Sequence, residues 1–376
     1  MRNVVLELSP EDSLRLNVLM MQADAIKIDE NEVAVYGLQG EQEMKVPLNP
    51  TGRADKYITV VRELLASVIL DSPGGYPVFL RRWTRMGQFE SDQLDRLLKI
   101  GEIEAVMAVV CAQGLTDELA RRAWWIAPYS EYARQMLMNP TIVNGTMGPI
   151  LAEHLVDHLP FETEHHIMLE TVRLVLQPGL INDTQRLKLW RSGQTKATYK
   201  IGFLQSRPDE IPEQLPPRHD YEQISAQLAP LIVSGNTIAQ VLDKALSANG
   251  QTYSQVVHDA MRRPADQDVI SALFNAIGHY FSGAKVIQGE FRMLEGVEQA
   301  VAKAMETDPV KAVLSTLPER EPEIKAILFL GHFDDAIVIP VFSMTDAVGS
   351  VMRKKIIHIS TPLLRCFSVL QGKVQR

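Results

Sequence analysis

The sequence predicts a mainly α-helical protein, organised as an irregular HEAT- or armadillo-like array of short antiparallel helices with a small mixed α/β cap at the N-terminus. From residue 91 onward, apolar residues recur at helical spacing, and Pro or Gly punctuates the chain at intervals of about one helix plus one turn. Short β-branched runs flanked by turn residues occur near the N-terminus. No strict sequence period is present, so an ordinary helical domain remains an alternative to a repeat array.

The first 70 residues predict a helix, a small antiparallel meander and a second helix. Ser9 can cap the first helix, and Pro10 suits its first position. Residues 52–70 return to helical spacing. The predicted strands are short and β-branched, and turn-rich sequence separates them: Ala25–Ile28, Val33–Tyr36 and Met44–Val46.

From Ser91 the pattern predicts a series of short helices. Ser91 and Thr116 can open helices, while Gly114 and Pro140 end them. Further helices are predicted over these stretches: 102–113, 116–127, 130–139, 149–158, 162–177, 183–191, 237–248, 252–263, 266–282 and 284–306. Ala336–Val341 is the one later segment that could form a strand, and Pro340 makes it a poor central one.

The punctuation divides the chain into four regions. Residues 1–90 form the cap, and residues 91–205 form the helical array. Residues 206–219 contain four prolines and are predicted to be a connector, because proline lacks a backbone donor and disfavours helix at the preceding residue. Residues 220–376 form a C-terminal helical region.

Composition and charge indicate a folded, soluble, cytoplasmic protein. Its 38 basic residues against 46 acidic ones give a net charge of −8, which argues against an extensive nucleic-acid footprint. The longest apolar runs are shorter than the ~20 residues that cross a bilayer, so we expect no membrane association. The N-terminus lacks the uninterrupted apolar region of a secretory signal.

The sequence contains no recognisable catalytic motif. Neither a GxxxxGK[ST] nor a GxGxxG phosphate loop is present, and GxSxG is absent too. We therefore predict no cofactor, and the chain is more consistent with a non-enzyme, although the sequence leaves this open.

The densest group of potential metal ligands surrounds His154 and His158. These histidines are four residues apart and would share one face of a helix. Leu155 stands where a zincin would carry glutamate. We favour solvated or interhelical histidines and predict no metal.

The two cysteines lie far apart and outside any CxxC motif. Cys111 lies in an apolar run and is expected to be a buried small hydrophobic residue. Cys366 follows Arg365, whose charge could lower the pKa of the thiol. A structural role is favoured for both, with a reactive thiolate kept as the alternative.

The strongest candidates for a binding site are arginines close to tryptophans. Arg81, Arg82 and Arg85 flank Trp83, and guanidinium groups pair with oxyanions and stack on rings. A second group, Arg121–Trp125, contains two adjacent tryptophans, which cannot both face the core of one helix. One is expected to meet a neighbouring helix and the other could be an exposed anchor; Trp125 is our candidate binding residue. The competing interpretation is that both groups seal packing junctions.

Four sequence runs resemble the DsrS family, whose members are cytoplasmic proteins encoded with the dissimilatory sulfite reductase genes of sulfur-oxidising bacteria. The runs are SPEDSLRLNVL (9–19), SPGGYPVFLRRWTRMGQ (72–88), GLTDELARRAWW (114–125) and VRLVLQPGLI (172–181). None is a catalytic motif, so no active-site residue carries over. The resemblance implies an accessory or regulatory role in the oxidation of stored sulfur.

The leading hypothesis is therefore a non-catalytic accessory protein that contacts another protein of the sulfur-oxidation system. One alternative is an enzyme or sulfur carrier that uses Cys366 or Cys111. The other is a regulator that binds RNA or DNA through Arg81, Arg82, Arg85 and Trp83, which the acidic net charge disfavours. The sequence leaves the partner and the oligomeric state open.

Overall fold

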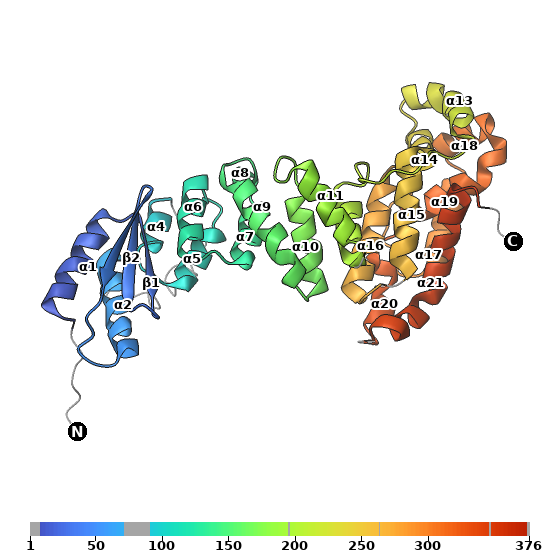
Figure 1. The fold of residues 1–376 in the computed structure, drawn as a ribbon. Coiled ribbons are helices and arrows are strands. Elements are labelled where there is room, and N and C mark those ends of the chain that lie inside the picture. The colour runs from blue at the N-terminus through green and yellow to red at the C-terminus, as the bar shows by residue number, and fades with distance from the viewer. Residues whose placement is uncertain (1–7, 71–90, 195, 263, 346, 374–376) are drawn as a thin grey trace. The chain divides into compact units, whose positions relative to one another are not determined.

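The computed structural model describes residues 8–70, 91–194, 196–262, 264–345 and 347–373. Within these residues the protein is mainly α-helical, with 20 helices and a three-stranded antiparallel sheet near the N-terminus (Figure 1). This confirms the predicted mainly α fold with strands near the N-terminus. The chain divides into two compact units, Met1–His158 and Leu159–Arg376, which we describe separately.

The N-terminal unit begins with a helix, a meander and a second helix, as predicted. Its sheet has the order β1-β2-β3, and both pairings are antiparallel. The elements are α1 (Pro10–Gln22), β1 (Ala25–Asp29), β2 (Ala34–Gln39), β3 (Gln42–Pro47) and α2 (Ala54–Leu70). Helix α1 packs closely on one face of the sheet, since a Cβ atom at Gly37 of β2 would lie 2.6 Å from Leu19 of α1. Glycine at position 37 therefore permits this close approach.

A buried carboxylate fixes α1 to the segments around it. Ser9 caps the helix, as the sequence predicts, by accepting a hydrogen bond from the Asp12 amide. Asp12 is fully buried and accepts hydrogen bonds from the Tyr57 hydroxyl at 2.6 Å and the Asn49 amide at 2.8 Å. Burial alone would raise the pKa of Asp12, but these hydrogen bonds to its charged form hold the pKa below its ordinary value.

We expect Tyr57→Phe to lower the free energy of unfolding of the N-terminal unit by about 1–3 kcal/mol. The substitution removes a hydrogen bond to a buried carboxylate and also the acceptor of the Ser9 amide. Urea denaturation measures the change. Tyr129→Phe is the matched control. Because Tyr129 is 50% exposed, this substitution should lower the free energy of unfolding by less than about 0.5 kcal/mol. Equal effects of the two substitutions would show that the Asp12 network does not stabilise the unit.

Short helices complete the N-terminal unit, in agreement with the helices predicted from residue 91. They are α4 (Ser91–Leu97), α5 (Ile103–Val110), α6 (Asp117–Ile126), α7 (Ser130–Leu137), α8 (Pro140–Val143) and α9 (Met147–His158). Thr116 caps α6 by accepting a hydrogen bond from the Leu119 amide. Asp117 in turn accepts hydrogen bonds from the amides of Thr146 and Met147, which fixes the start of α9.

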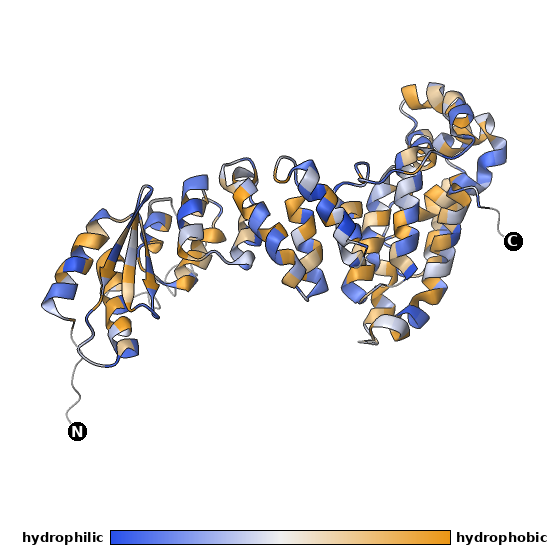
Figure 2. Cartoon of the chain, viewed as in Figure 1, coloured by the Kyte–Doolittle hydropathy of each residue, from blue (hydrophilic) through white to orange (hydrophobic). Residues whose placement is uncertain are grey.

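The described part of the C-terminal unit contains only helices and irregular segments. The helices are α10 (His165–Val175), α11 (Asp183–Ser192), α12 (Ala197–Ser206), α13 (Tyr221–Val233), α14 (Thr237–Leu246), α15 (Ala248–Arg262), α16 (Gln267–Tyr280), α17 (Leu294–Ala304), α18 (Asp308–Thr316), α19 (Glu321–Gly331), α20 (Ile339–Phe342) and α21 (Gly349–Leu370). Helix α12 lies at the centre of one group and packs against α10, α15 and α16. Most helices in both units carry hydrophobic and hydrophilic residues along their length, as amphipathic helices do (Figure 2).

Two predicted elements of this unit are wrong. Ala336–Val341 is not a strand; a 3₁₀ turn (Asp335–Ile337) precedes α20, and Asp334 caps that turn by accepting a hydrogen bond from the Ala336 amide. The helix predicted from Ala284 begins at Leu294 instead. Gly289 has a φ of +152°, which is incompatible with a helix, so the preceding residues form an irregular segment.

The proline-rich segment contains no helix or strand from residue 207 to residue 220, but its end is firmly anchored. The Arg218 side chain is 3% exposed and binds Asp220 and Glu323, each within 3 Å. The Arg218 amide also donates to the Leu246 carbonyl. No helix within the described ranges is long and apolar enough to cross a bilayer.

Candidate interaction surface

Only one of the five predicted binding residues lies in the described part of the chain. Arg81, Arg82, Trp83 and Arg85 fall in residues 71–90, outside it. Trp125 lies on α6 and is half-buried. The candidate surface is therefore built from Trp125 outward.

Trp125 is held against the sheet by two residues of β1 and β3. Its indole Nε1 donates a hydrogen bond to the Glu43 carboxylate at 2.8 Å. The Lys27 ammonium lies 4.5 Å from the centre of the Trp125 ring and 3.4 Å from the same carboxylate. A cation over an indole face is attracted to its π-electrons, so the three side chains support one another.

This cluster occupies the face of the sheet opposite α1. Lys27, Tyr36 and Lys45 are register partners on β1, β2 and β3, so their side chains share a face. Gly37, the neighbour of Tyr36, faces α1, and successive residues of a strand point to opposite sides. We call Lys27, Tyr36, Glu43, Lys45 and Trp125 the Trp125 surface.

The strand residues of the Trp125 surface are linked by an ion pair and an aromatic ring. The Lys45 ammonium lies 2.6 Å from the Glu32 carboxylate, which also accepts a hydrogen bond from the Tyr36 hydroxyl. Lys27 and Lys45 lie 5.1 and 5.2 Å from the Tyr36 ring centre. The hydrogen bond from Lys45 lowers the pKa of Glu32, so this carboxylate stays ionised at neutral pH. The surface thus presents aromatic rings among charges that are already ordered.

The arginines that precede Trp125 have structural partners. Arg121 donates hydrogen bonds to Glu118 and to the Gly40 carbonyl, and Arg122 donates to Glu118 and Asp95. The hydrogen bond from Arg121 is the main reason that the pKa of Glu118 falls to about 2. These guanidinium groups therefore connect α6 to its neighbours.

Trp124 and the two histidines form a separate aromatic contact between helices. Trp124 meets His154 of α9 edge to face, with ring centres 4.8 Å apart, so one of the two adjacent tryptophans contacts a neighbouring helix. His154 stacks on His158 and lies 3.1 Å from the Ser130 hydroxyl. Burial lowers the pKa of His154. In the described ranges, no three His, Cys, Asp or Glu side chains are grouped so that they could hold a metal ion.

The cysteines differ from the expectations for them. Cys111 is exposed at the C-terminal end of α5, so the prediction of a buried residue is wrong. The apolar run that contains Cys111 ends with the helix, which leaves the thiol outside the core. Burial raises the pKa of Cys366 to about 12 and outweighs the opposite effect of Arg365.

We expect iodoacetamide at pH 8 to modify Cys111 at least about tenfold faster than Cys366, because the thiolate is the reactive form. Burial raises the pKa of both thiols, but it raises that of Cys366 to about 12, and Cys111 is the more exposed of the two. Mass spectrometry of peptides from timed samples gives both rates. In urea the two rates should converge. Faster modification of Cys366 in the folded protein would contradict this account of its environment.

Sequence reasoning missed four members of the Trp125 surface, namely Lys27, Tyr36, Glu43 and Lys45. The sequence does offer one signal that charged and aromatic residues gather on one face of the sheet: Glu43 and Lys45 alternate along a predicted strand, and alternate residues of a strand share a face. The contact with Trp125, however, depends on how α6 packs against β1.

Comparison with known proteins supplies no family for this chain: no family model, curated protein or solved structure matches it. A proposal for its function therefore depends on the Trp125 surface and on the sequence runs already described.

Proposed function

We propose that this protein is a non-catalytic accessory or regulatory protein of dissimilatory sulfur oxidation, cytoplasmic and acting through contacts with another protein of that system. The observation that carries the binding role is Trp125, a half-buried indole held in place by Glu43 and Lys27. Tryptophan is among the residue types that contribute most to the stability of protein interfaces. The sulfur-oxidation context comes from the four runs that resemble the DsrS family.

The proposed binding residues combine Trp125 with Arg81, Arg82, Trp83 and Arg85. Arginine and tryptophan are both enriched at interfaces, where guanidinium groups pair with carboxylates and lie flat on rings. Such a group favours a partner with an acidic surface.

The helices from α4 to α9 support the finer proposal of a HEAT- or armadillo-like array. Within this stretch each helix packs mainly on helices close to it in the sequence, as in α4 with α5, α5 with α6 and α7 with α9. Helix α12 instead packs against α15 and α16, which are separated from it in the sequence by other helices. This packing resembles that of a helix bundle. The array proposal therefore applies best to residues 91–158.

The exposure of Cys111 favours one second candidate, a sulfur carrier that uses a single thiolate. Replacing both cysteines with Ser distinguishes the two functions. A binding protein should support sulfur oxidation in cells at an unchanged rate, whereas a carrier should lose that activity.

A tagged pull-down from sulfur-oxidising cells, followed by mass spectrometry, tests the proposed function. We expect the pull-down to recover a specific protein of the sulfur-oxidation system. The amount recovered should fall at least about fivefold with Trp125→Ala, and also with the combined Arg81→Ala, Arg82→Ala and Arg85→Ala variant. Tyr129→Ala is the control, because Tyr129 is an exposed aromatic outside the Trp125 surface. Recovery of no partner, or recovery equal for all variants, would contradict the proposal.

A further inference from the structure

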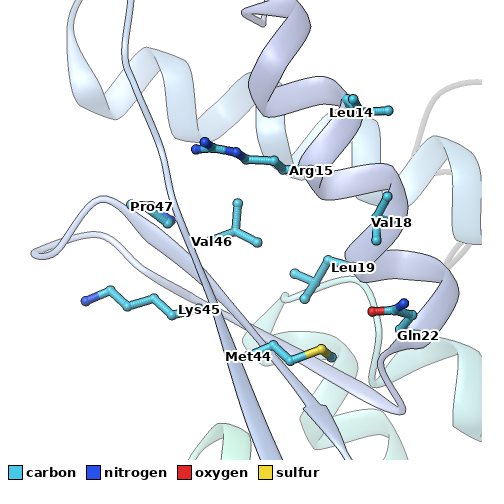
Figure 3. A pocket seen from close by; sticks show the side chains of 9 residues that line it. All are labelled: Leu14, Arg15, Val18, Leu19, Gln22, Met44, Lys45, Val46 and Pro47. Atoms are coloured by element: carbon cyan, nitrogen blue, oxygen red, sulfur yellow. The ribbon is translucent and has the colours of Figure 1, made fainter.

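Two surfaces of the protein differ in whether their charges are already paired. The first is an apolar groove between α1 and β3, which Arg15 and Lys45 help to line (Figure 3). Arg15 lies 2.5 Å from the Glu11 carboxylate, and the Lys45 ammonium is bound to Glu32. These ion pairs leave no free charge in the groove. The second surface is the exposed face of α21, whose cations are unpaired.

The C-terminal part of the sequence has a charge opposite to that of the whole chain. Residues 347–376 contain six Lys and Arg residues and no Asp or Glu, whereas the whole chain has 46 acidic residues against 38 basic ones. Helix α21 spans most of this stretch, and its N-terminal half contains Arg353, Lys354 and Lys355. A helix macrodipole favours cations in the last turn, but the last turn of α21 contains none. The dipole therefore does not account for these charges.

Helix α21 turns one face to the core and the other outward. Its core face packs against α15 and α19 and consists of Met352, Ile356, Ile359, Leu363, Phe367 and Leu370. Lys354, His358 and Arg365 are exposed and follow one another at intervals of four and seven residues. Residues at these intervals share one face of a helix, so the three side chains form a stripe on the outward face. Lys355 is exposed beside this stripe.

The cations of the outward face have no partner in the part of the chain that the structure describes. There, Lys354, Lys355 and Arg365 form no ion pair and no side-chain hydrogen bond. The acidic side chains of α15 and α19 have other partners, namely Gln255 for Asp259, Lys325 for Glu321 and Arg218 for Glu323. The positive charge of this face is therefore available to another molecule.

Apolar side chains lie among these cations and select the kind of partner. Val351 is 54% exposed and Ile357 is 60% exposed, and each lies three residues from Lys354, so both are its neighbours on the helix surface. A protein partner buries such side chains, since interfaces combine an apolar core with a polar rim. The phosphates of a nucleic-acid backbone would leave them exposed. Insertion into a bilayer needs a largely apolar face, and that face of α21 is buried in the core.

We infer that the outward face of α21 binds an acidic amphipathic segment of a partner protein. Carboxylates of that segment pair with Lys354, Lys355 and Arg365, while its apolar side chains cover Val351 and Ile357. This binding site goes beyond the proposed function, because α21 belongs to the C-terminal unit and shares no residue with the Trp125 surface. Either site can therefore fail its test without the other.

Selection of random peptides displayed on phage against the full chain tests the inference. The peptides have about 15 residues, which is enough for four helical turns. A parallel selection uses the full chain with Lys354→Glu and Arg365→Glu. We expect the original chain, and not this variant, to enrich acidic peptides that also contain apolar residues. A fluorescein-labelled synthetic copy of one enriched peptide then gives dissociation constants by fluorescence anisotropy.

Matched variants separate this face from the rest of the surface. Lys354→Glu with Arg365→Glu should weaken peptide binding at least about tenfold, and raising NaCl from about 50 to about 300 mM should weaken it at least about threefold, because salt screens exposed ion pairs. Lys56→Glu with Lys188→Glu makes the same change in net charge at exposed positions of α2 and α11, and should stay within about twofold. Trp125→Ala should also stay within that limit. Circular dichroism confirms that each variant is folded.

The inference is overturned by any of three results. One is a selection that enriches no acidic peptide, or that enriches the same peptides with the charge-reversed variant. Another is equal binding of a peptide copy in which Gln and Asn replace Glu and Asp. The last is a different occupant that the charge reversal displaces, seen as tighter binding of a DNA duplex or of phosphatidylglycerol vesicles than of the peptide, or as a dimer of the chain in sedimentation.

Discussion

Replacing Arg218 with Ala is expected to lower the free energy of unfolding of the C-terminal unit by about 2–3 kcal/mol, because it removes one of the two guanidinium groups that pair with Asp220 and Glu323. The other, from Arg320, still lies 2.9 and 3.2 Å from these carboxylates. The Arg218 side chain is 3% exposed and binds Asp220 through two nitrogens, at 2.6 and 2.8 Å. A third nitrogen lies 2.9 Å from Glu323 of α19. Urea denaturation followed by circular dichroism measures the loss.

The effect of Arg218→Ala should also depend on pH. The hydrogen bonds from Arg218 lower the pKa of Asp220 below its ordinary value. A carboxyl whose pKa is lowered by folding contributes stability above its unfolded pKa and loses that contribution as the pH falls. The difference between the original chain and the variant should therefore shrink below about pH 4.

Arg292→Ala is the control for this ion pair. Arg292 is 69% exposed and pairs with Glu290 at the surface, so its loss should cost less than about 1 kcal/mol. A similar cost for the two substitutions, at any pH, would contradict the role assigned to Arg218.

Gly278→Ala is expected to destabilise the C-terminal unit by about 3 kcal/mol. Glycine inside a helix normally costs ~0.5–1 kcal/mol relative to alanine, so the usual effect of this substitution has the opposite sign. Here a Cβ atom on α16 would lie only 1.9 Å from the Phe333 carbonyl oxygen. A backbone carbonyl cannot rotate away as a side chain can, so either α16 or the segment before α20 must move.

Gly296→Ala provides the comparison for a glycine in another helix. Its added Cβ atom would lie 3.2 Å from the Phe291 ring, a side chain that can shift. We expect Gly296→Ala to change the free energy of unfolding by less than about 1 kcal/mol in either direction. Thermal and urea unfolding of both variants measure the difference, and stabilisation by Gly278→Ala would show that α16 does not approach the Phe333 backbone this closely.

The helices were predictable where local signals mark their ends. Ser9 and Thr116 cap α1 and α6 as expected, and the β-branched runs of the meander became β1, β2 and β3. Ala336–Val341 shows the limit of such signals. Its β-branched residues favour a strand, but the Asp334 cap and Pro340 near the start of α20 produce helical turns.

The candidate surface was predictable only at Trp125. Its hydrogen-bond partner Glu43 lies 82 residues earlier, and no spacing rule connects the two. Cys366 shows the same difficulty for electrostatics, because adjacency to Arg365 is visible in the sequence and burial of the thiol is not. Tertiary packing determines both properties.

Photo-crosslinking in living sulfur-oxidising cells tests the proposed binding role most directly. Benzoylphenylalanine replaces Glu41, an exposed residue whose side chain lies 3.9 Å from Arg121 of α6, the helix that carries Trp125. The matched control places the same group at Phe161, which is 82% exposed in the C-terminal unit. We predict one dominant crosslinked protein of the sulfur-oxidation system at position 41, absent when Trp125 is also changed to Ala. No adduct at position 41, or the same adducts at positions 41 and 161, would contradict the proposal that this surface binds a partner.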